Sequence, residues 1–174
     1  MRRHILLIIA ISFTVFIPVA LYAQTTTVTA LAELGASLGI ESTPGELSFG
    51  KLSCSNTPGT CNVSTRNVLS TTGGVSVSSG NPTAAIFTVT GKNGASYNIT
   101  LPGSSVLLTH ADGIHSMSVS NFSIETQSNG LSPTGTINAT TGVDVLIVGA
   151  TLNTQSAQFE GRYSGTFTVI VSYN

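Results

Sequence analysis

The chain has 174 residues, of which 41% are hydrophobic and only 7% are charged, and its formal net charge is −1. This length suits one ordinary domain, and the charged fraction lies far below the roughly 25% of typical soluble domains. No basic surplus suggests a nucleic-acid-binding protein, and no acidic surplus suggests a solvating tail. The neutral composition, rich in Ser, Thr, Asn and Gly, is typical of secreted β proteins.

Residues 1–23 have the order of a secretory signal peptide. Arg2 and Arg3 come first, an apolar run follows, and the small residue Ala23 stands at the expected cleavage point. The apolar run is also near the lower limit for a membrane span, so an uncleaved anchor is the alternative. We expect cleavage after Ala23 and export to the periplasm, the cell surface or an extracellular fibre. The mature chain, residues 24–174, would carry four basic and seven acidic side chains and no membrane span.

Residues 24–40 form a segment whose conformation the sequence leaves open. Its apolar residues alternate, which indicates an extended strand, although its Ala-Leu-Ala-Glu-Leu run would also tolerate a helix. Gly35 and Gly39 weigh against the helix. We therefore expect an N-terminal extension at 24–40, followed by one domain at 41–174. The alternating apolar residues are Val28, Ala30, Ala32, Leu34, Ala36, Leu38 and Ile40.

Cys54 and Cys61 flank the sequence SNTPGT, whose Pro58-Gly59 pair predicts a turn. In an oxidising compartment, two cysteines close together around a turn most simply form a local disulfide. The sequence therefore predicts a Cys54–Cys61 bond. A CxxC redox motif or a zinc cluster is excluded by this spacing and by the lack of a nearby histidine.

From residue 41 onward, short runs of period 2 alternate with clusters of Gly, Asn, Pro and Ser. Many short strands at such spacing predict an all-β antiparallel sandwich or barrel. Within 116–125 the alternation changes phase between Val119 and Phe122, which indicates a β-bulge. The predicted strands are 46–52, 63–70, 74–78, 85–90, 96–101, 106–109, 116–125, 135–139, 143–152 and 164–173.

Few residues suggest chemistry. His110, Asp112 and His115 lie close together in THADGIH and would suit a metal ion, but no further strong ligand is near, and a polar turn is the simpler interpretation. Serine is abundant, yet no GxSxG motif occurs, and residues 24–174 contain only these two histidines. The carboxylates are dispersed rather than paired. We therefore predict no enzyme, no metal site and no cofactor.

The last predicted strand lies in GRYSGTFTVIVSYN, where Phe167, Val169, Val171 and Tyr173 alternate with other residues. A strand with an unpaired edge can accept a strand from another chain. Chaperone–usher pilins end in such an alternating strand, with a penultimate tyrosine and a glycine fourteen residues from the end. Tyr173 and Gly161 occupy these two positions. In pilins this strand is recognised by a periplasmic chaperone and later borders the groove that takes the next subunit's N-terminal extension.

A broader resemblance covers most of the chain. It rests on six segments: GELSFG (45–50), IFTVTG (86–91), SYNITLP (96–102), SMSVSNF (116–122), VGATL (148–152) and GRYSGTFTVIVSYN (161–174). Taken in this order and spacing, they resemble the secreted bacterial family called domain of unknown function 4402, near the spore coat protein U and fimbrial-subunit families. The resemblance implies a Gram-negative envelope protein with a pilin-like, immunoglobulin-like antiparallel β-sandwich. It implies no demonstrated activity.

These observations lead to two hypotheses of different kinds. In the first, the protein is a structural subunit of a surface fibre or coat that assembles by donor-strand exchange with itself or a related subunit, aided by a periplasmic chaperone. The donor side chains would be Val28, Ala30, Ala32, Leu34 and Ala36. In the second, the same segment completes its own sandwich, and the protein is a monomeric, adhesin-like binding module at the cell surface, with a glycan as one candidate ligand. Tyr97 and Tyr163 are candidate glycan contacts, although ordinary sheet positions explain them more simply.

Overall fold

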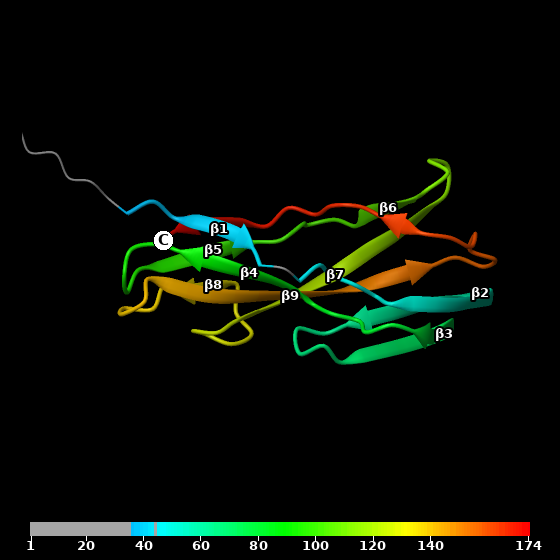
Figure 1. The fold of residues 1–174 in the computed structure, drawn as a ribbon, viewed down its shortest axis with the longest axis horizontal. Coiled ribbons are helices and arrows are strands. Elements are labelled where there is room, and N and C mark those ends of the chain that lie inside the picture. Colours follow the sequence, from blue (N-terminus) through cyan, green and yellow to red (C-terminus); the bar gives the residue numbers. More distant parts are fainter. Residues whose placement is uncertain (1–35, 44) are drawn as a thin grey trace, which may run out of the picture. The chain divides into compact units, whose positions relative to one another are not determined.

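The computed structural model describes residues 36–43 and 45–174, and every regular element within these ranges is a β-strand (Figure 1). The strands are β1 (Gly39–Ser42), β2 (Lys51–Val63), β3 (Leu69–Ser79), β4 (Ala85–Thr90), β5 (Ser96–Thr100), β6 (Val106–His110), β7 (Ser116–Thr126), β8 (Thr134–Thr136), β9 (Val143–Thr154), β10 (Tyr163–Ser164) and β11 (Ile170–Tyr173). The predicted all-β class is therefore confirmed.

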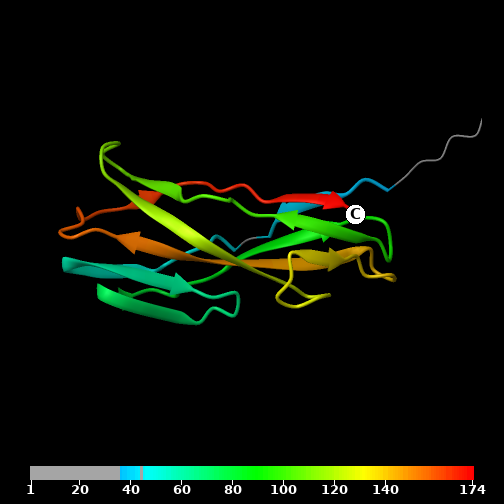
Figure 2. The same cartoon turned by 180° about the vertical axis from the view of Figure 1, so that it is seen from behind.

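The strands form two antiparallel sheets (Figures 1 and 2). The larger sheet has the order β1-β4-β9-β7-β6-β10, and β2 joins it by pairing with both β9 and β3. The smaller sheet has the order β11-β5-β8. Packing of the two sheets gives the expected antiparallel sandwich, while its finer immunoglobulin-like classification stays a prediction.

Strand β9 organises the larger sheet. Its first half pairs with β4 and its second half with β2, while β7 runs along its other side. Because β9 has neighbours on both sides, most of its side chains are buried. Two apolar clusters result. The β2 core contains Phe49, Cys61, Val63, Val75, Ala84, Val119, Ala150 and Leu152. The β11 core contains Ala85, Val89, Tyr97, Ile99, Ile137, Leu146 and Val148.

The β-bulge expected from the phase change is present in β7. The pairing of β7 with β9 shifts register between Ser120 and Ser123, and Asn121 has a φ of +50°. One extra residue on the bulged strand restores the inward direction of the apolar side chains that follow it. This prediction is confirmed.

The strand predicted at 63–70 is wrong. Residues 64–68 form a turn in which the Ser64 hydroxyl accepts hydrogen bonds from the backbone N–H groups of Arg66 (3.3 Å) and Val68 (3.1 Å). Asn67 has a φ of +57° in the same turn. Short polar side chains offer the backbone local partners and so compete with strand pairing.

The region of the cysteines also differs from its prediction. Strand β2 continues through Pro58-Gly59 without reversing direction, and a register irregularity between Cys54 and Gly59 takes the place of the predicted turn. Cys54 and Cys61 are free thiols, the first exposed and the second buried. They pair with Val75 and Thr71, which lie four residues apart in β3. Such a separation is about 13 Å in an extended strand, whereas a disulfide requires Cα atoms within about 7 Å. The predicted bond is therefore absent from this structure.

The single strand predicted at 164–173 is divided in two. Strand β10 pairs with β6 in the larger sheet, and β11 pairs with β5 in the smaller sheet. Residues 165–169 cross between the sheets, yet Phe167 and Val169 still pack against the β11 core. The alternation therefore identifies the partly buried side chains of Phe167, Val169 and Val171, but neither the exposure of Tyr173 nor which strand each part joins.

The boundary expected between residues 40 and 41 also moves. Gly39 and Ile40 belong to β1, and they pair with Thr90 and Val89 of β4. The last residues of the predicted extension are thus part of the sandwich itself.

Candidate functional site

The most distinctive feature of the described residues is a pair of strands with unpaired edges. Within this part of the chain β1 pairs only with β4, and β11 pairs only with β5. The two strands belong to different sheets, so each leaves one row of backbone N–H and C=O groups without a strand partner. We call these two strands the β1/β11 edge pair.

The edge pair meets at one end through Tyr173. Its hydroxyl accepts a hydrogen bond from the backbone N–H of Lys92 (2.7 Å) and donates one to the carbonyl of Ala36 (3.2 Å). Gly91 lies between the two strands, because a Cβ there would be 2.6 Å from the Tyr173 hydroxyl and 3.1 Å from Cδ1 of Leu38. Strand β1 starts beside this contact and β11 ends at it, so the two strands run in opposite directions.

Apolar side chains along the edge pair are only partly covered. Leu38 and Ile40 on one side and Phe167, Val169 and Val171 on the other all pack against the β11 core while remaining partly exposed. This row contrasts with the centre of that core, whose largest side chains are almost fully buried.

Phe167 is the best-anchored member of this row. Its ring centroid lies 6.2 Å from that of Phe87 and 5.3 Å from that of Phe122, both in the larger sheet. Beside it is a hollow of about 270 Å³, which also borders the exposed side chain of Ile170.

The structure brings together only some of the residues that the sequence singled out. Val171 and Tyr173 lie in β11, whereas Phe167 and Val169 precede that strand. Gly161 lies elsewhere, next to His110: it has a φ of +145°, and a Cβ there would overlap the His110 ring. Of the proposed donor side chains, Ala36 is exposed. Val28, Ala30, Ala32 and Leu34 lie outside the described residues.

Sequence reasoning missed the contribution of Gly91 and of the Lys92 backbone. The GKNG sequence at 91–94 has the composition of a turn and by itself indicates nothing more. The need for glycine at position 91 arises from Leu38 and Tyr173, which are distant in the chain and carry no local signal.

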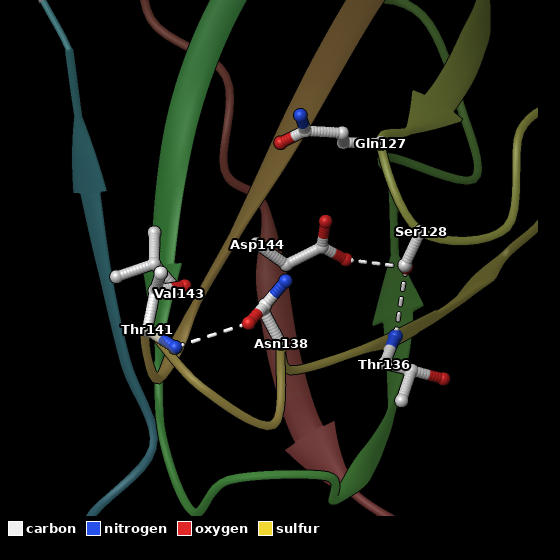
Figure 3. A pocket seen from close by; sticks show the side chains of 7 residues that line it. All are labelled: Gln127, Ser128, Thr136, Asn138, Thr141, Val143 and Asp144. Atoms are coloured by element: carbon white, nitrogen blue, oxygen red, sulfur yellow. Dashed lines mark hydrogen bonds between the residues drawn. The ribbon is translucent and has the colours of Figure 1, made fainter.

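A second candidate is a polar hollow of about 350 Å³ (Figure 3). Its one carboxylate, Asp144, is 3% exposed and accepts hydrogen bonds from the hydroxyls of Ser128 (2.6 Å) and Tyr97 (2.9 Å) and from the N–H of Val145 (2.9 Å). Burial and the bond to Asp144 raise the pKa of Tyr97 well above its usual range, so its hydroxyl stays a donor. Tyr97 and Asp144 belong to different sheets. We therefore assign this carboxylate a structural role in joining them.

A third candidate is the turn between β6 and β7. Nδ1 of His115 lies 2.6 Å from Oδ2 of Asp112, and Nδ1 of His110 lies 3.0 Å from Oδ1 of the same carboxylate. Partial desolvation opposes the effect, but hydrogen bonds from the Ile114 and His115 N–H groups, together with the two nearby imidazoles, lower the pKa of Asp112 well below its usual range. The structure thus gathers the three residues into one cluster.

The fold and the edge pair define this protein as an antiparallel β-sandwich in which, within the described residues, two neighbouring strands of different sheets each have one unpaired edge. The family model described as Domain of unknown function (DUF4402) matches residues 38–173, and the chain belongs to this family. Searches among curated proteins and among solved structures found no match. Within the described ranges no helix is long and apolar enough to cross a membrane.

Proposed function

We propose that this protein is a structural subunit of a bacterial surface fibre or coat, joined to its neighbours by strand exchange. An extended strand from a second subunit would insert at the β1/β11 edge pair. The observation that carries the proposal is the combination, at one place, of two unpaired strand edges and a partly covered apolar row.

The backbone supplies the first part of this interaction. Proteins usually protect an exposed edge with a charged side chain, a proline or a bulge. Strand β11 has the sequence IVSY and contains none of these devices. An added strand would hydrogen-bond to this edge, and its alternate side chains would cover the apolar row. Because β1 and β11 run in opposite directions, a strand that pairs with both is parallel to one of them and antiparallel to the other.

Residues 24–36 of a neighbouring copy are the proposed donor. Their alternation places the side chains of Val28, Ala30, Ala32, Leu34 and Ala36 on one face of an extended strand. Each buried methylene would contribute about 0.8 kcal/mol. Export by way of residues 1–23, a periplasmic chaperone as a partner, and a relationship to pilins and spore coat proteins belong to the same proposal.

A self-complemented, adhesin-like binding module is the second candidate. It is favoured by the hydrogen bond of 3.2 Å from the Tyr173 hydroxyl to the Ala36 carbonyl, which holds the end of the extension beside the chain's own β11. If residues 24–35 turn back at this point, they complete their own sandwich and leave no edge for a neighbour. The two candidates differ in whether the strand acts within one chain or between chains.

The deciding experiment compares boiled and unboiled samples of residues 24–174, expressed in a bacterial periplasm, on a denaturing gel. A ladder that collapses to one band on boiling supports strand exchange. A monomer band in both lanes, from a folded protein, supports the self-complemented module. Leu34→Asp should remove the ladder, whereas the matched control Leu131→Asp, at a side chain that is 72% exposed in a loop, should keep it. A normal ladder from the Leu34 variant would contradict the proposed donor.

A further inference from the structure

We propose that His110, Asp112 and His115 form a binding site for a divalent transition-metal ion, with Zn²⁺ as the probe ion. The site lies in the hairpin turn that connects β6 and β7. It is separate from the β1/β11 edge pair, and the inference does not depend on strand exchange.

The turn places the three side chains together. The backbone N–H of His110 donates to the carbonyl of His115 (2.8 Å), and the N–H of Gly113 donates to the carbonyl of His110 (2.9 Å). Gly113 has a φ of +74°, a conformation that favours glycine. These bonds close the turn and direct both imidazoles toward the carboxylate of Asp112.

The distances suit a shared ion. One ligand atom from each of the three residues lies within 4.8 Å of the other two. Zinc binds histidine nitrogen and carboxylate oxygen at about 2.0–2.2 Å, so ligands around a tetrahedral ion are roughly 3.3–3.5 Å apart. To reach this spacing, the contact of His110 with Asp112 at 3.0 Å would lengthen by about 0.3–0.5 Å and that of His115 at 2.6 Å by about 0.7–0.9 Å. A fourth position would remain for water or another ligand.

The imidazoles are held from outside the turn, which is an observation independent of their spacing. The ring of His115 stacks on that of Phe159 with a centroid distance of 4.2 Å and an interplanar angle of 3°. The ring of His110 lies between Phe159 (5.1 Å) and Tyr163 (4.9 Å). Neighbouring groups that fix the orientation of a histidine support metal binding, because less ordering remains for the ion to impose.

Gly161 determines which nitrogen of His110 is available. The Nε2 atom packs against Gly161, where a Cβ would overlap it, so Nδ1 is the nitrogen that faces Asp112. This Nδ1 also accepts a hydrogen bond from the backbone N–H of Asp112 (3.1 Å), and metal binding would break that bond. The segment 159–163 thus builds one side of the site, although about fifty residues separate it from the turn.

Charge both favours and opposes a cation here. Residues 24–174 carry seven acidic and four basic side chains, and Asp112 contributes a charge within the cluster itself. The segment 159–163 also contains the basic residue Arg162, whose backbone carbonyl accepts a hydrogen bond from the N–H of Ala111 (3.0 Å) and so places this residue next to the turn.

The test is calorimetric titration of the full-length protein, purified without a histidine tag, with ZnCl₂. We expect saturable binding of one ion per chain in the micromolar range and a thermal midpoint that rises with zinc, because the ion binds the folded state. His115→Gln and Asp112→Asn should each weaken binding about tenfold or more. Glu160→Gln is the matched charge control, because it removes an exposed carboxylate from the segment 159–163 that is not one of the three ligands. It should leave the affinity for zinc nearly unchanged.

Two further readouts keep the outcome decisive. Cys54 and Cys61 are alternative zinc ligands. Titration with Co²⁺ distinguishes the cysteines from the proposed site, because only binding to cysteine gives sulfur-to-cobalt charge-transfer absorption. Circular dichroism checks that the variants remain folded, and His115, whose side chain is 42% exposed, is the safer position to change. Three results would overturn the proposal: no saturable binding, a charge-transfer band from sulfur, or unchanged affinity in a folded His115→Gln variant. The three residues would then form a hydrogen-bonded turn without a metal ion.

Discussion

Two exposed edges of this sandwich differ in what lies beneath them. Strand β3 pairs only with β2 among the described strands, so it presents an unpaired edge of eleven residues. Its sequence, LSTTGGVSVSS, is uncharged, and most of its side chains are small, polar and exposed. The β1/β11 edge pair is shorter, but partly covered apolar side chains lie along it. An unpaired backbone alone is therefore insufficient to mark an assembly site, and the uncovered apolar row distinguishes the second edge.

The largest expected effect comes from placing a charge on each edge in turn. Val171→Asp should abolish the boiling-sensitive ladder and lower the free energy of unfolding by about 2–4 kcal/mol, because its side chain packs against the β11 core. Val77→Asp on β3 changes a side chain that is 40% exposed and should cost about 0.5 kcal/mol without affecting the ladder. Gels and urea unfolding measure both. Loss of the ladder in the Val77 variant would remove the distinction between the edges.

A smaller effect is expected where the two strands of the edge pair meet. In Gly91→Ala the new Cβ would crowd the Tyr173 hydroxyl at 2.6 Å and Leu38 at 3.1 Å. Overpacking of this kind should destabilise the domain by about 1–3 kcal/mol and weaken assembly. Gly103→Ala is the control, since a Cβ there meets nothing within 4 Å. If both variants have the same urea midpoint, the close packing of Gly91 against Tyr173 and Leu38 makes no measurable contribution to stability.

Two tyrosine hydroxyls allow a closely matched test. Tyr173 contacts Lys92 and Ala36 at the edge pair, whereas Tyr163 donates to the carbonyl of Phe159 (2.7 Å) and accepts from the Gln158 side chain (2.9 Å) elsewhere. Replacing either tyrosine by phenylalanine removes two hydrogen bonds, and each should cost about 1–2 kcal/mol. Only Tyr173→Phe should reduce assembly. If both variants assemble equally well, Tyr173 has no special role in assembly at the β1/β11 edge pair.

The last prediction concerns the reactivity of the two cysteines of β2 and involves no change in stability. Thiol titration of the native protein should detect Cys54 readily and Cys61 slowly, because Cys61 is buried. Burial first, and the electrostatic effect of Cys54 second, raise the pKa of Cys61 to about 11, so its thiolate and its reactivity should increase only as the pH rises toward that value. Denatured protein should titrate as two thiols. No titratable thiol would mean that a disulfide forms and that β2 rearranges locally.

Local patterns predicted much of the fold. Period-2 alternation indicated the strand at 85–90 with the observed bounds, and the phase change within 116–125 indicated the bulge at Asn121. The same reasoning failed at 63–70, where the hydroxyl of Ser64 and the positive φ of Asn67 form a turn. It also failed at Pro58-Gly59, because a register irregularity within β2 accommodates these residues without reversing the chain.

The candidate sites were less predictable, because each depends on contacts between distant segments. The sequence identified Tyr173 as a feature of the last strand, but its contact with Ala36 spans 137 positions. It identified His110, Asp112 and His115 as neighbours, yet the aromatic rings that contact the two imidazoles come from Phe159, before β10, and from Tyr163, in β10. The division of 164–173 between two sheets likewise depends on β5 and β6 as partners.

The sequence by itself determined the class and the family of this protein. Alternation is a property of neighbouring residues, so it specifies strands and their buried faces before any pairing is known. The choice of partner for each strand is decided by tertiary structure, since register and sheet order depend on which apolar faces can be buried together. Only the assembled sandwich therefore determines that β1 and β11 lie at unpaired edges, and that Gly161 makes room for the ring of His110.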